Sequence, residues 1–217
     1  MEDLLTVVGV GPGSESYLTP LARQVIDEAE VIVAGERLLE AFAGEGKSTF
    51  VIKNNLEDVV NFIKKNLKEK KVAVLASGDP GMYGILNFLL RHFSPEQMEV
   101  IPGISSVQLA CARLRISWHD AVITSVHGRE IKGLVDLVRN HDKVITLTDY
   151  RLTPAVVAQE LIVAGVVGKK VWVCQNLSYS NEFVREFSLE SLAKSPGYPG
   201  SVMVIVNYEH KVGGPDE

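Results

Sequence analysis

Apolar and polar positions alternate along the chain in a way that predicts strands separated by helices. In the first half, short runs predicted to be strands lie at 4–9, 31–34, 49–52, 72–76 and 99–101. The run at 4–9 is mainly apolar and that at 72–76 is apolar throughout, in the way typical of buried strands. Helical periodicity between these runs predicts helices at 20–29, 56–67, 82–93 and 105–114. Strands that alternate with helices are typical of a mostly parallel sheet with helices on both faces.

The second half begins with the same alternation and then changes. Strands are expected at 121–126, 143–148 and 170–174, with helices at 130–140 and 153–165. Two further strands, 183–187 and 201–207, follow each other through a short helix and a Pro/Gly turn, which favours antiparallel pairing. We therefore predict an α/β protein with a mostly parallel N-terminal sheet and a mixed C-terminal sheet. The predicted domains are 1–116 and 117–217, and no Ser/Gly-rich linker separates them, so the junction near residue 116 is expected to be tight.

Composition narrows the class of protein. The chain has 217 residues, 46% hydrophobic, with a net charge of −5, which excludes a disordered chain and disfavours a nucleic-acid binder. No apolar run is long enough to span a membrane, and the acidic N-terminus lacks the features of a signal peptide, so we expect a cytoplasmic protein. The two cysteines, Cys111 and Cys174, lie in apolar runs and are interpreted as buried structural thiols.

The first glycine-rich loop, 9–14, follows a predicted strand, where a dinucleotide fingerprint would lie. It is not that fingerprint, because Ser14 stands at the third glycine position and Pro12 removes a backbone N–H from the loop. The following helix also begins late, at Pro20 behind its cap Thr19. The loop is either a tight turn at the strand exit or a place where a ligand approaches the backbone closely.

Two more glycine-bearing loops, 76–84 and 101–106, also leave predicted strands. Asp79 in the first of them either accepts a hydrogen bond from a ligand or caps the next helix. Ser105 and Ser106 in the second are either plain N-cap residues or turn a hydroxyl toward a ligand. Ligands of open α/β sheets bind beyond the carboxyl ends of the strands, so three such loops together indicate a small-molecule site.

Other polar clusters carry weaker signals. His127 and Arg129, at the end of a predicted strand, are candidates for acid/base work or carboxylate binding, although a single His is more often structural. No His/Cys/Asp/Glu cluster has metal-ligand spacing, so no protein-bound metal is expected. The basic stretch 64–71 is interpreted as a solvated helix end.

The loops together resemble the tetrapyrrole (corrin/porphyrin) methylase superfamily. The matching motifs are G-x-G-P-G at 9–13 followed by L-T-x-x-A at 18–22, G-D-P at 78–80 with Tyr-Gly at 83–84, and P-G-I-S-S at 102–106. Within the superfamily, S-x-H-G-R at 125–129, W-H-D-A at 118–121, L-T-D at 147–149 and N-L-S-Y at 176–179 are similar to the branch of cobalt-precorrin-7 C5-methyltransferases of cobalamin biosynthesis.

The resemblance implies a homodimer of two-domain chains, with S-adenosylmethionine bound in the cleft between the domains. The motif positions that it implies for cofactor binding are Pro12, Gly78, Asp79, Met82, Ser105, Ser106, Thr148, Leu177 and Val202. A nucleophilic ring carbon would attack the activated methyl group, so the protein would mainly position the reactants and exclude water.

A tetrapyrrole with several carboxylates requires cationic partners. The implied substrate-binding residues are Gly11, Tyr83, Arg113 and Arg129, with Arg115 and Lys132 as further cations and His127 and Arg129 as the candidate catalytic residues. Helix-end solvation is the plainer interpretation of Arg113 and Arg115. His127 is a candidate for removing the meso proton after methylation.

Other functions remain open at this point. Within the superfamily, the alternatives are methylation of another ring carbon and diphthine synthesis. Outside it, the alternatives are a nucleotide-binding oxidoreductase and a non-catalytic subunit that delivers a corrinoid intermediate. A partner that methylates C15 and decarboxylates is possible, because that domain is fused to this one in longer members of the branch.

Overall fold

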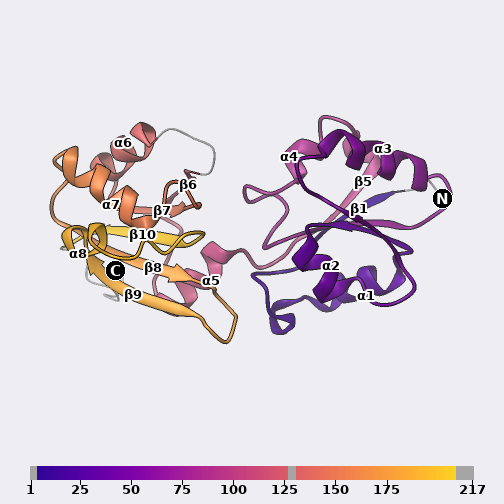
Figure 1. The fold of residues 1–217 in the computed structure, drawn as a ribbon, viewed down its shortest axis with the longest axis horizontal. Coiled ribbons are helices and arrows are strands. Elements are labelled where there is room, and N and C mark those ends of the chain that lie inside the picture. The colour runs from indigo at the N-terminus through magenta and orange to yellow at the C-terminus, as the bar shows by residue number, and fades with distance from the viewer. Residues whose placement is uncertain (1–3, 127–130, 209–217) are drawn as a thin grey trace. The chain divides into compact units, whose positions relative to one another are not determined.

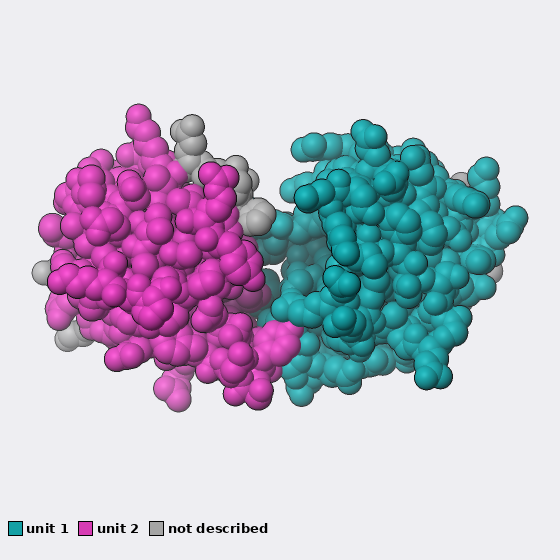
Figure 2. Space-filling model, viewed as in Figure 1, with its two compact units in different colours: residues 1–105 teal, residues 106–217 magenta. Residues whose placement is uncertain are grey.

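The computed structural model of the protein describes residues 4–126 and 131–208. The chain divides into two compact units, residues 1–105 and 106–217 (Figure 2). The sequence-based expectation was a junction near residue 116. The boundary lies earlier because α5 (Ser106–Leu114) packs against β10 (Val202–Asn207), a strand of the second unit.

The first unit contains a five-stranded sheet in which every neighbouring pair is parallel. The strand order is β3-β2-β4-β1-β5. Its strands are β1 (Leu5–Gly9), β2 (Val31–Ala34), β3 (Ser48–Val51), β4 (Val72–Ala76) and β5 (Met98–Ile101). Its α-helices are α1 (Pro20–Glu28), α2 (Glu36–Phe42), α3 (Leu56–Asn66) and α4 (Leu86–Leu89). The predicted parallel sheet is confirmed.

Helices cover both faces of this sheet, α1 and α2 on one face and α3 and α4 on the other (Figure 1). Side chains of β1 point alternately into the two cores, since Val8 packs with Ile26 of α1 while Val7 packs with Ile63 of α3. A strand buried on both faces reads as an unbroken apolar run, which is why β1, β2 and β4 were predicted to within a residue.

Two features of the first unit differ from expectation. Helix α2 was not predicted, because its seven residues carry too short a periodic pattern. The helix expected at 82–93 is only the single turn α4, Leu86–Leu89. Tyr83 adopts a left-handed backbone with φ of 53°, and a side chain at Gly84 would lie 2.6 Å from the carbonyl of Pro80. This tight turn prevents an earlier start of the helix.

The second unit contains a five-stranded mixed sheet in the order β6-β7-β10-β8-β9. Only β6 and β7 pair in parallel; the other neighbours are antiparallel. In addition to β10, its strands are β6 (Val122–Ser125), β7 (Lys143–Leu147), β8 (Lys169–Gln175) and β9 (Phe183–Ser188). In addition to α5, its helices are α6 (Lys132–Asn140), α7 (Pro154–Val163) and α8 (Leu189–Ala193). The predicted mixed sheet is confirmed.

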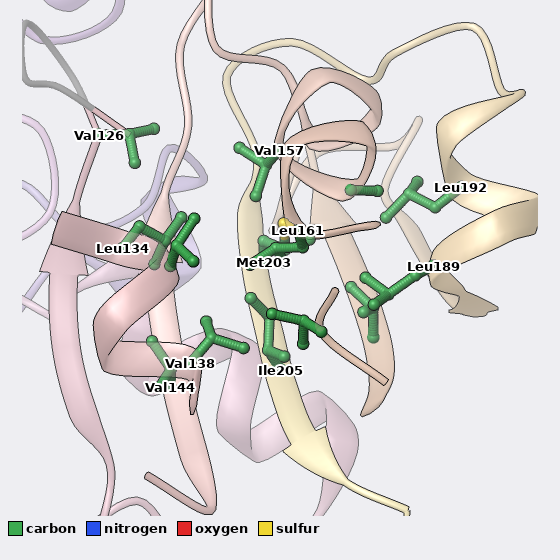
Figure 3. Close-up of a cluster of buried hydrophobic side chains, with 14 of the residues drawn as sticks. Val126, Leu134, Val138, Val144, Val157, Leu161, Leu189, Leu192, Met203 and Ile205 are labelled. Atoms are coloured by element: carbon green, nitrogen blue, oxygen red, sulfur yellow. The ribbon is translucent and has the colours of Figure 1, made fainter. Parts of the chain in front are cut away.

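One face of the mixed sheet forms a core with α6, α7 and α8. Met203 and Ile205 of β10 point into it among valine and leucine side chains (Figure 3). The alternate residues of β10, Val202, Val204 and Val206, are also buried and point to the opposite face. Helix α5 packs against β10, and its Cys111 is one of the groups that raise the pKa of Cys174 of β8, after burial itself.

Candidate functional site

The three glycine-bearing loops of the first unit meet at one edge of its sheet. Strands β4, β1 and β5 are neighbours and run in parallel, so the loops that follow Ala76, Gly9 and Ile101 leave the same edge. The first two loops are joined by an isolated antiparallel bridge: the N–H of Gly11 donates to the carbonyl of Gly78 at 3.2 Å, and the N–H of Gly78 donates back at 2.7 Å. The structure thus brings the loops predicted to form a site into direct contact.

Glycine is required where these loops touch. A Cβ at Gly103 would lie 2.2 Å from the carbonyl oxygen of Gly78, and a Cβ at Gly9 would lie 2.5 Å from the backbone nitrogen of Gly103. Both distances are far below van der Waals contact, and the obstructing atoms are backbone. The three backbones approach one another more closely than any side chain permits.

Asp79 links the second and third loops through both of its carboxylate oxygens. Oδ1 accepts from the N–H of Gly81 at 2.8 Å, and Oδ2 accepts from the N–H of Gly103 at 3.2 Å. The alternative that Asp79 caps the next helix is wrong, because α4 does not begin until Leu86. Asp79 therefore holds the loops in place, whatever it also does for a ligand.

The first loop turns sharply before the helix that follows it. Gly11 has a φ of 77°, and a Cβ there would lie 2.9 Å from the carbonyl oxygen of Tyr17. Pro12 is buried, and a 3₁₀ turn, Glu15–Tyr17, separates the loop from α1. Helix α1 begins at Pro20 behind Thr19, whose hydroxyl accepts from the N–H of Ala22 at 3.1 Å, as predicted. The helix N-terminus does not follow the glycines directly, unlike in a dinucleotide fingerprint.

The remaining predicted residues of the first unit lie in or beside these loops. Met82 is half-buried, and its N–H donates to the carbonyl of Asp79 at 3.2 Å. Tyr83 is 42% exposed at the tip of the same loop. Ser105 is 2% exposed and directly precedes α5, which begins at Ser106.

The predicted residues of the second unit also converge, at one end of its mixed sheet. Val202 begins β10 and lies opposite Leu147 of β7 and Cys174 of β8, so it is next to Thr148 and close to Leu177 along the chain. The hydroxyl of Thr148 donates to the carbonyl of Ser201 at 2.9 Å and accepts from its N–H at 3.0 Å. The side chains of Thr148, Leu177 and Val202 are all buried.

The loop that carries Leu177 has an unusual backbone. Asn176 and Ser178 have φ values of 51° and 74°, in the left-handed region that favours glycine. The carboxylate of Glu182 accepts from the N–H of Ser178 at 2.7 Å and thereby holds this turn. Glu182 was not predicted, and nothing in its local sequence distinguishes it from a solvated acid.

Arg113 is the partner of Glu182. Its Nε lies 2.5 Å from one carboxylate oxygen and a terminal nitrogen lies 3.2 Å from the other, a two-point contact between α5 and the 176–182 turn. Hydrogen bonding from Arg113 lowers the pKa of Glu182, so this carboxyl is ionised at neutral pH. Part of the charge of Arg113, a candidate substrate ligand, is already engaged within the protein.

The other predicted cations are spread over different places. Arg115 follows α5 with a φ of 55° and is exposed, and Lys132 is exposed at the first position of α6. His127 and Arg129, the candidate catalytic residues, lie outside the described residues, and their roles stay predictions.

Both cysteine thiols are buried and uncharged. Burial raises the pKa of Cys111 to about 11 and that of Cys174 to about 12, so both thiols are protonated at neutral pH. The prediction of buried structural thiols is confirmed.

Within the described residues, no three His, Cys, Asp or Glu side chains gather as a metal site would need. None of the helices there combines the length and apolar character that a membrane span requires.

The fold and the three loops define the class of the protein. Residues 4–193 match the model of the tetrapyrrole (corrin/porphyrin) methylases, and the chain belongs to this family. The chain is 38% identical over 212 residues to a probable cobalt-precorrin-7 C(5)-methyltransferase of Methanocaldococcus jannaschii, which covers 95% of this chain and 98% of that protein. The expected family is confirmed.

One further relative is longer than this chain, and two solved structures share its fold. The chain is 33% identical to the precorrin-6Y C(5,15)-methyltransferase [decarboxylating] of a Sinorhizobium species over 83% of its own length and 44% of that protein. Among solved structures, the precorrin-6Y methylase of Archaeoglobus fulgidus has a TM-score of 0.72, with 24% identity over 96% of this chain and all of that chain. The uroporphyrin-III C-methyltransferase of Thermus thermophilus with S-adenosylhomocysteine has a TM-score of 0.74, with 24% identity over 94% of this chain and 97% of that chain.

Proposed function

We propose that the protein transfers a methyl group from S-adenosylmethionine to C5 of cobalt-precorrin-7 in cobalamin biosynthesis. The observation that carries the proposal is the 38% identity to a probable cobalt-precorrin-7 C(5)-methyltransferase over nearly the whole of both chains. The edge formed by the three loops supports it, since this is where open α/β sheets bind small molecules.

S-adenosylmethionine is proposed as the methyl donor because a neighbour of the same fold was solved with S-adenosylhomocysteine. The loop edge suits a cofactor of this kind, because Gly11 and Gly78 are hydrogen-bonded through their backbones and Gly103 lies too close to Gly78 to carry a side chain. Such an edge offers backbone N–H and carbonyl groups to the polar atoms of an adenosine and an amino acid. When bound, the cofactor supplies a methyl group already activated on a sulfonium.

The residues proposed to bind the cofactor in the first unit act mainly through their loops. Asp79 fixes the relative positions of the second and third loops, while Gly78 and Pro12 shape the edge. Met82 lies in the second loop, and Ser105 and Ser106 lie at the end of the third, so they continue the same edge. In the second unit, Thr148, Leu177 and Val202 have buried side chains, so their proposed contribution comes from the backbone of their loops.

The proposed substrate ligands are Gly11, Tyr83, Arg113 and Arg129. Tyr83 is the one whose exposure is clearest, at the tip of the second loop. Arg113 keeps a partly exposed guanidinium beside Glu182, so it can meet a substrate carboxylate only while sharing its charge. His127 and Arg129 are proposed as the catalytic pair, with His127 accepting the meso proton after methylation.

We also propose a cytoplasmic homodimer that can act beside a C15-methylating decarboxylase. The relative that carries the C(5,15) name spans more than twice the matched length, which supports an association of the two activities. Sedimentation of the purified protein checks the dimer. Co-purification with a separately expressed decarboxylating methylase checks the partner.

The decisive experiment is turnover with a labelled methyl donor. The purified protein is incubated with cobalt-precorrin-7 and S-adenosylmethionine that carries ¹³C in the methyl group, and the product is examined by carbon NMR. A new methyl signal at C5 supports the proposal, while a signal at another ring carbon assigns a different methylase of the family. The absence of turnover, with S-adenosylhomocysteine also failing to bind, would overturn it. Binding of NADH instead would favour the oxidoreductase.

A further inference from the structure

A basic pocket lies in the first unit between the end of α3 and the segment that leads into β5. It has a volume of about 1110 Å³. Its lining residues are Lys64, Lys65, Leu67, Lys68, His92, Phe93, Ser94, Glu96 and Gln97. The basic stretch that was interpreted as a solvated helix end therefore forms one wall of a cavity, and a second segment forms the other wall.

This pocket is at the edge of the sheet opposite to the glycine loops. Helix α3 ends shortly before β4 begins, and the 3₁₀ turn Pro95–Gln97 directly precedes β5, so the pocket lies at the amino ends of these strands. The glycine loops leave the carboxyl ends of the same parallel strands. The five residues of β4 span about 16 Å, at roughly 3.3 Å per residue, so the pocket is separate from the candidate cofactor site.

The pocket has an excess of positive charge. Three lysines face one carboxylate, that of Glu96, whose pKa is lowered by hydrogen bonds from its own backbone and from Ser94. Within the described part of the chain, none of the three lysines forms an ion pair, whereas Lys71 pairs with Glu28 at 2.9 Å. The dipole of α3 favours cations in its last turn, which accounts for lysines at this end of the helix. It does not account for the second segment, which forms the other wall of the pocket beside these lysines.

The second wall is ordered by its own contacts. The N–H of Ser94 donates to the side-chain oxygen of Gln97 at 3.0 Å, and the rings of Phe88 and His92 lie 4.8 Å apart. Phe93 is buried, and the ammonium of Lys64 lies 5.6 Å from the centre of its ring. The pocket thus combines a fixed backbone wall and an apolar floor with flexible ammonium groups above them.

We propose that this pocket binds a small polyanion, a molecule with at least two phosphate or carboxylate groups, at a site separate from the methyl-transfer site. Ammonium groups on flexible chains act as point charges and accept either kind of anion. Several of them around one cavity favour a ligand with several charges over a single small anion.

The test is calorimetry of the purified full chain with inorganic pyrophosphate and with citrate at moderate salt. The pocket variant is the double substitution Lys64→Gln/Lys68→Gln. The matched control is Lys53→Gln/Lys70→Gln, which removes the same charge from exposed positions of the same unit that do not line the pocket. Circular dichroism checks that both variants fold, and S-adenosylhomocysteine affinity is measured on each.

We expect the wild-type protein to bind pyrophosphate, citrate or both. The pocket variant should bind that probe at least about tenfold more weakly, while the control changes by less than about twofold. Tighter binding of pyrophosphate assigns phosphate groups, and tighter binding of citrate assigns carboxylates. No binding to the wild type, or equal weakening in both variants, would overturn the proposal. S-adenosylhomocysteine affinity should be the same in all three proteins, so this result is independent of the proposed methyl transfer.

Discussion

The two units hold their candidate site loops by different means. In the first unit, the loops touch backbone to backbone at Gly9, Gly78 and Gly103, and one carboxylate, Asp79, ties two of them. In the second unit, the 176–182 turn depends on side chains, through the contact of Arg113 with Glu182. The first arrangement tolerates no added atoms, whereas the second can lose a contact and admit water in its place.

This difference sets how much a substitution should cost. Where backbone atoms fill the space, an added methyl group forces the strands apart. Where a half-exposed ion pair holds a turn, solvent compensates for much of its loss. Four predictions test this contrast, from the largest expected effect to the smallest.

Gly103→Ala should have the largest effect. Its Cβ would lie 2.2 Å from the carbonyl oxygen of Gly78, so the loops must separate, at a cost of about 3 kcal/mol or more in the free energy of unfolding. Chemical denaturation measures the cost. Hydrogen exchange should quicken in β1, β4 and β5, and S-adenosylhomocysteine affinity should fall.

Gly133→Ala provides the matched control for that substitution. Gly133 lies in α6 with nothing within 4 Å of a built Cβ, so alanine should stabilise the helix by about 0.5–1 kcal/mol. If Gly103→Ala were as harmless as Gly133→Ala, the tight backbone contact would not exist in solution.

Asp79→Asn should have the next largest effect. The amide keeps the shape of the side chain but presents an N–H where one carboxylate oxygen now accepts from a backbone N–H, which leaves a donor facing a donor. We expect a loss of about 1–3 kcal/mol in stability together with weaker S-adenosylhomocysteine binding. Thermal unfolding and calorimetry measure the two. Weaker binding with unchanged stability would mean that Asp79 acts on the ligand and does not hold the loops.

Glu182→Gln should cost less. Arg113 is 37% exposed, so water can solvate its guanidinium once the carboxylate is gone. We expect a loss of no more than about 1 kcal/mol in stability. Hydrogen exchange at the 176–182 turn should quicken, since Ser178 loses its carboxylate acceptor. A loss as large as that of Gly103→Ala would contradict the contrast between the units.

Acid should weaken the second unit by a small amount. Hydrogen bonding from Lys143 lowers the pKa of Asp120, and Arg113 does the same for Glu182. A carboxyl whose pKa is lower in the folded state stabilises the protein at any pH above its unfolded-state pKa, which is near 4. This stabilisation is lost as the pH falls through the folded-state pKa. Both tryptophans, Trp118 and Trp172, lie in this unit, so their fluorescence during urea unfolding reports on it.

The urea midpoint should therefore fall as the pH drops from about 5 to 3. The fall should be shallower in Glu182→Gln, which has no carboxyl to protonate at that position. An identical fall in the variant and the wild type would show that the ion pair of Arg113 with Glu182 does not contribute.

Local patterns predicted most of the fold. Strands buried on both faces, such as β1 and β4, are continuous apolar runs, and Thr19 with Pro20 marks the start of α1. The failures have local causes as well. The helix expected from residue 82 is only one turn long and begins at Leu86, because Tyr83 has a left-handed backbone. That conformation is a property of the folded loop, and the residue type does not reveal it.

The site divides in the same way. Glycine marks the first-unit loops in the sequence, because only glycine fits where backbones touch. Nothing in the sequence identifies Glu182 in the same way. Its role depends on Arg113, which is distant in sequence, and on a left-handed backbone at two residues that are not glycine. Asp79 was found as a candidate ligand contact, but its two bonds to loop N–H groups became visible only with the strands in place.

The strand order of the first unit has a consequence for how the chain is made. Strand β1 is synthesised first, but its neighbours are β4 and β5, which end at residues 76 and 101. Pairing across such long stretches of chain is slow, and an apolar strand without its neighbours is prone to aggregate. Strand β1 must therefore wait for almost the entire unit to leave the ribosome before both of its edges are paired.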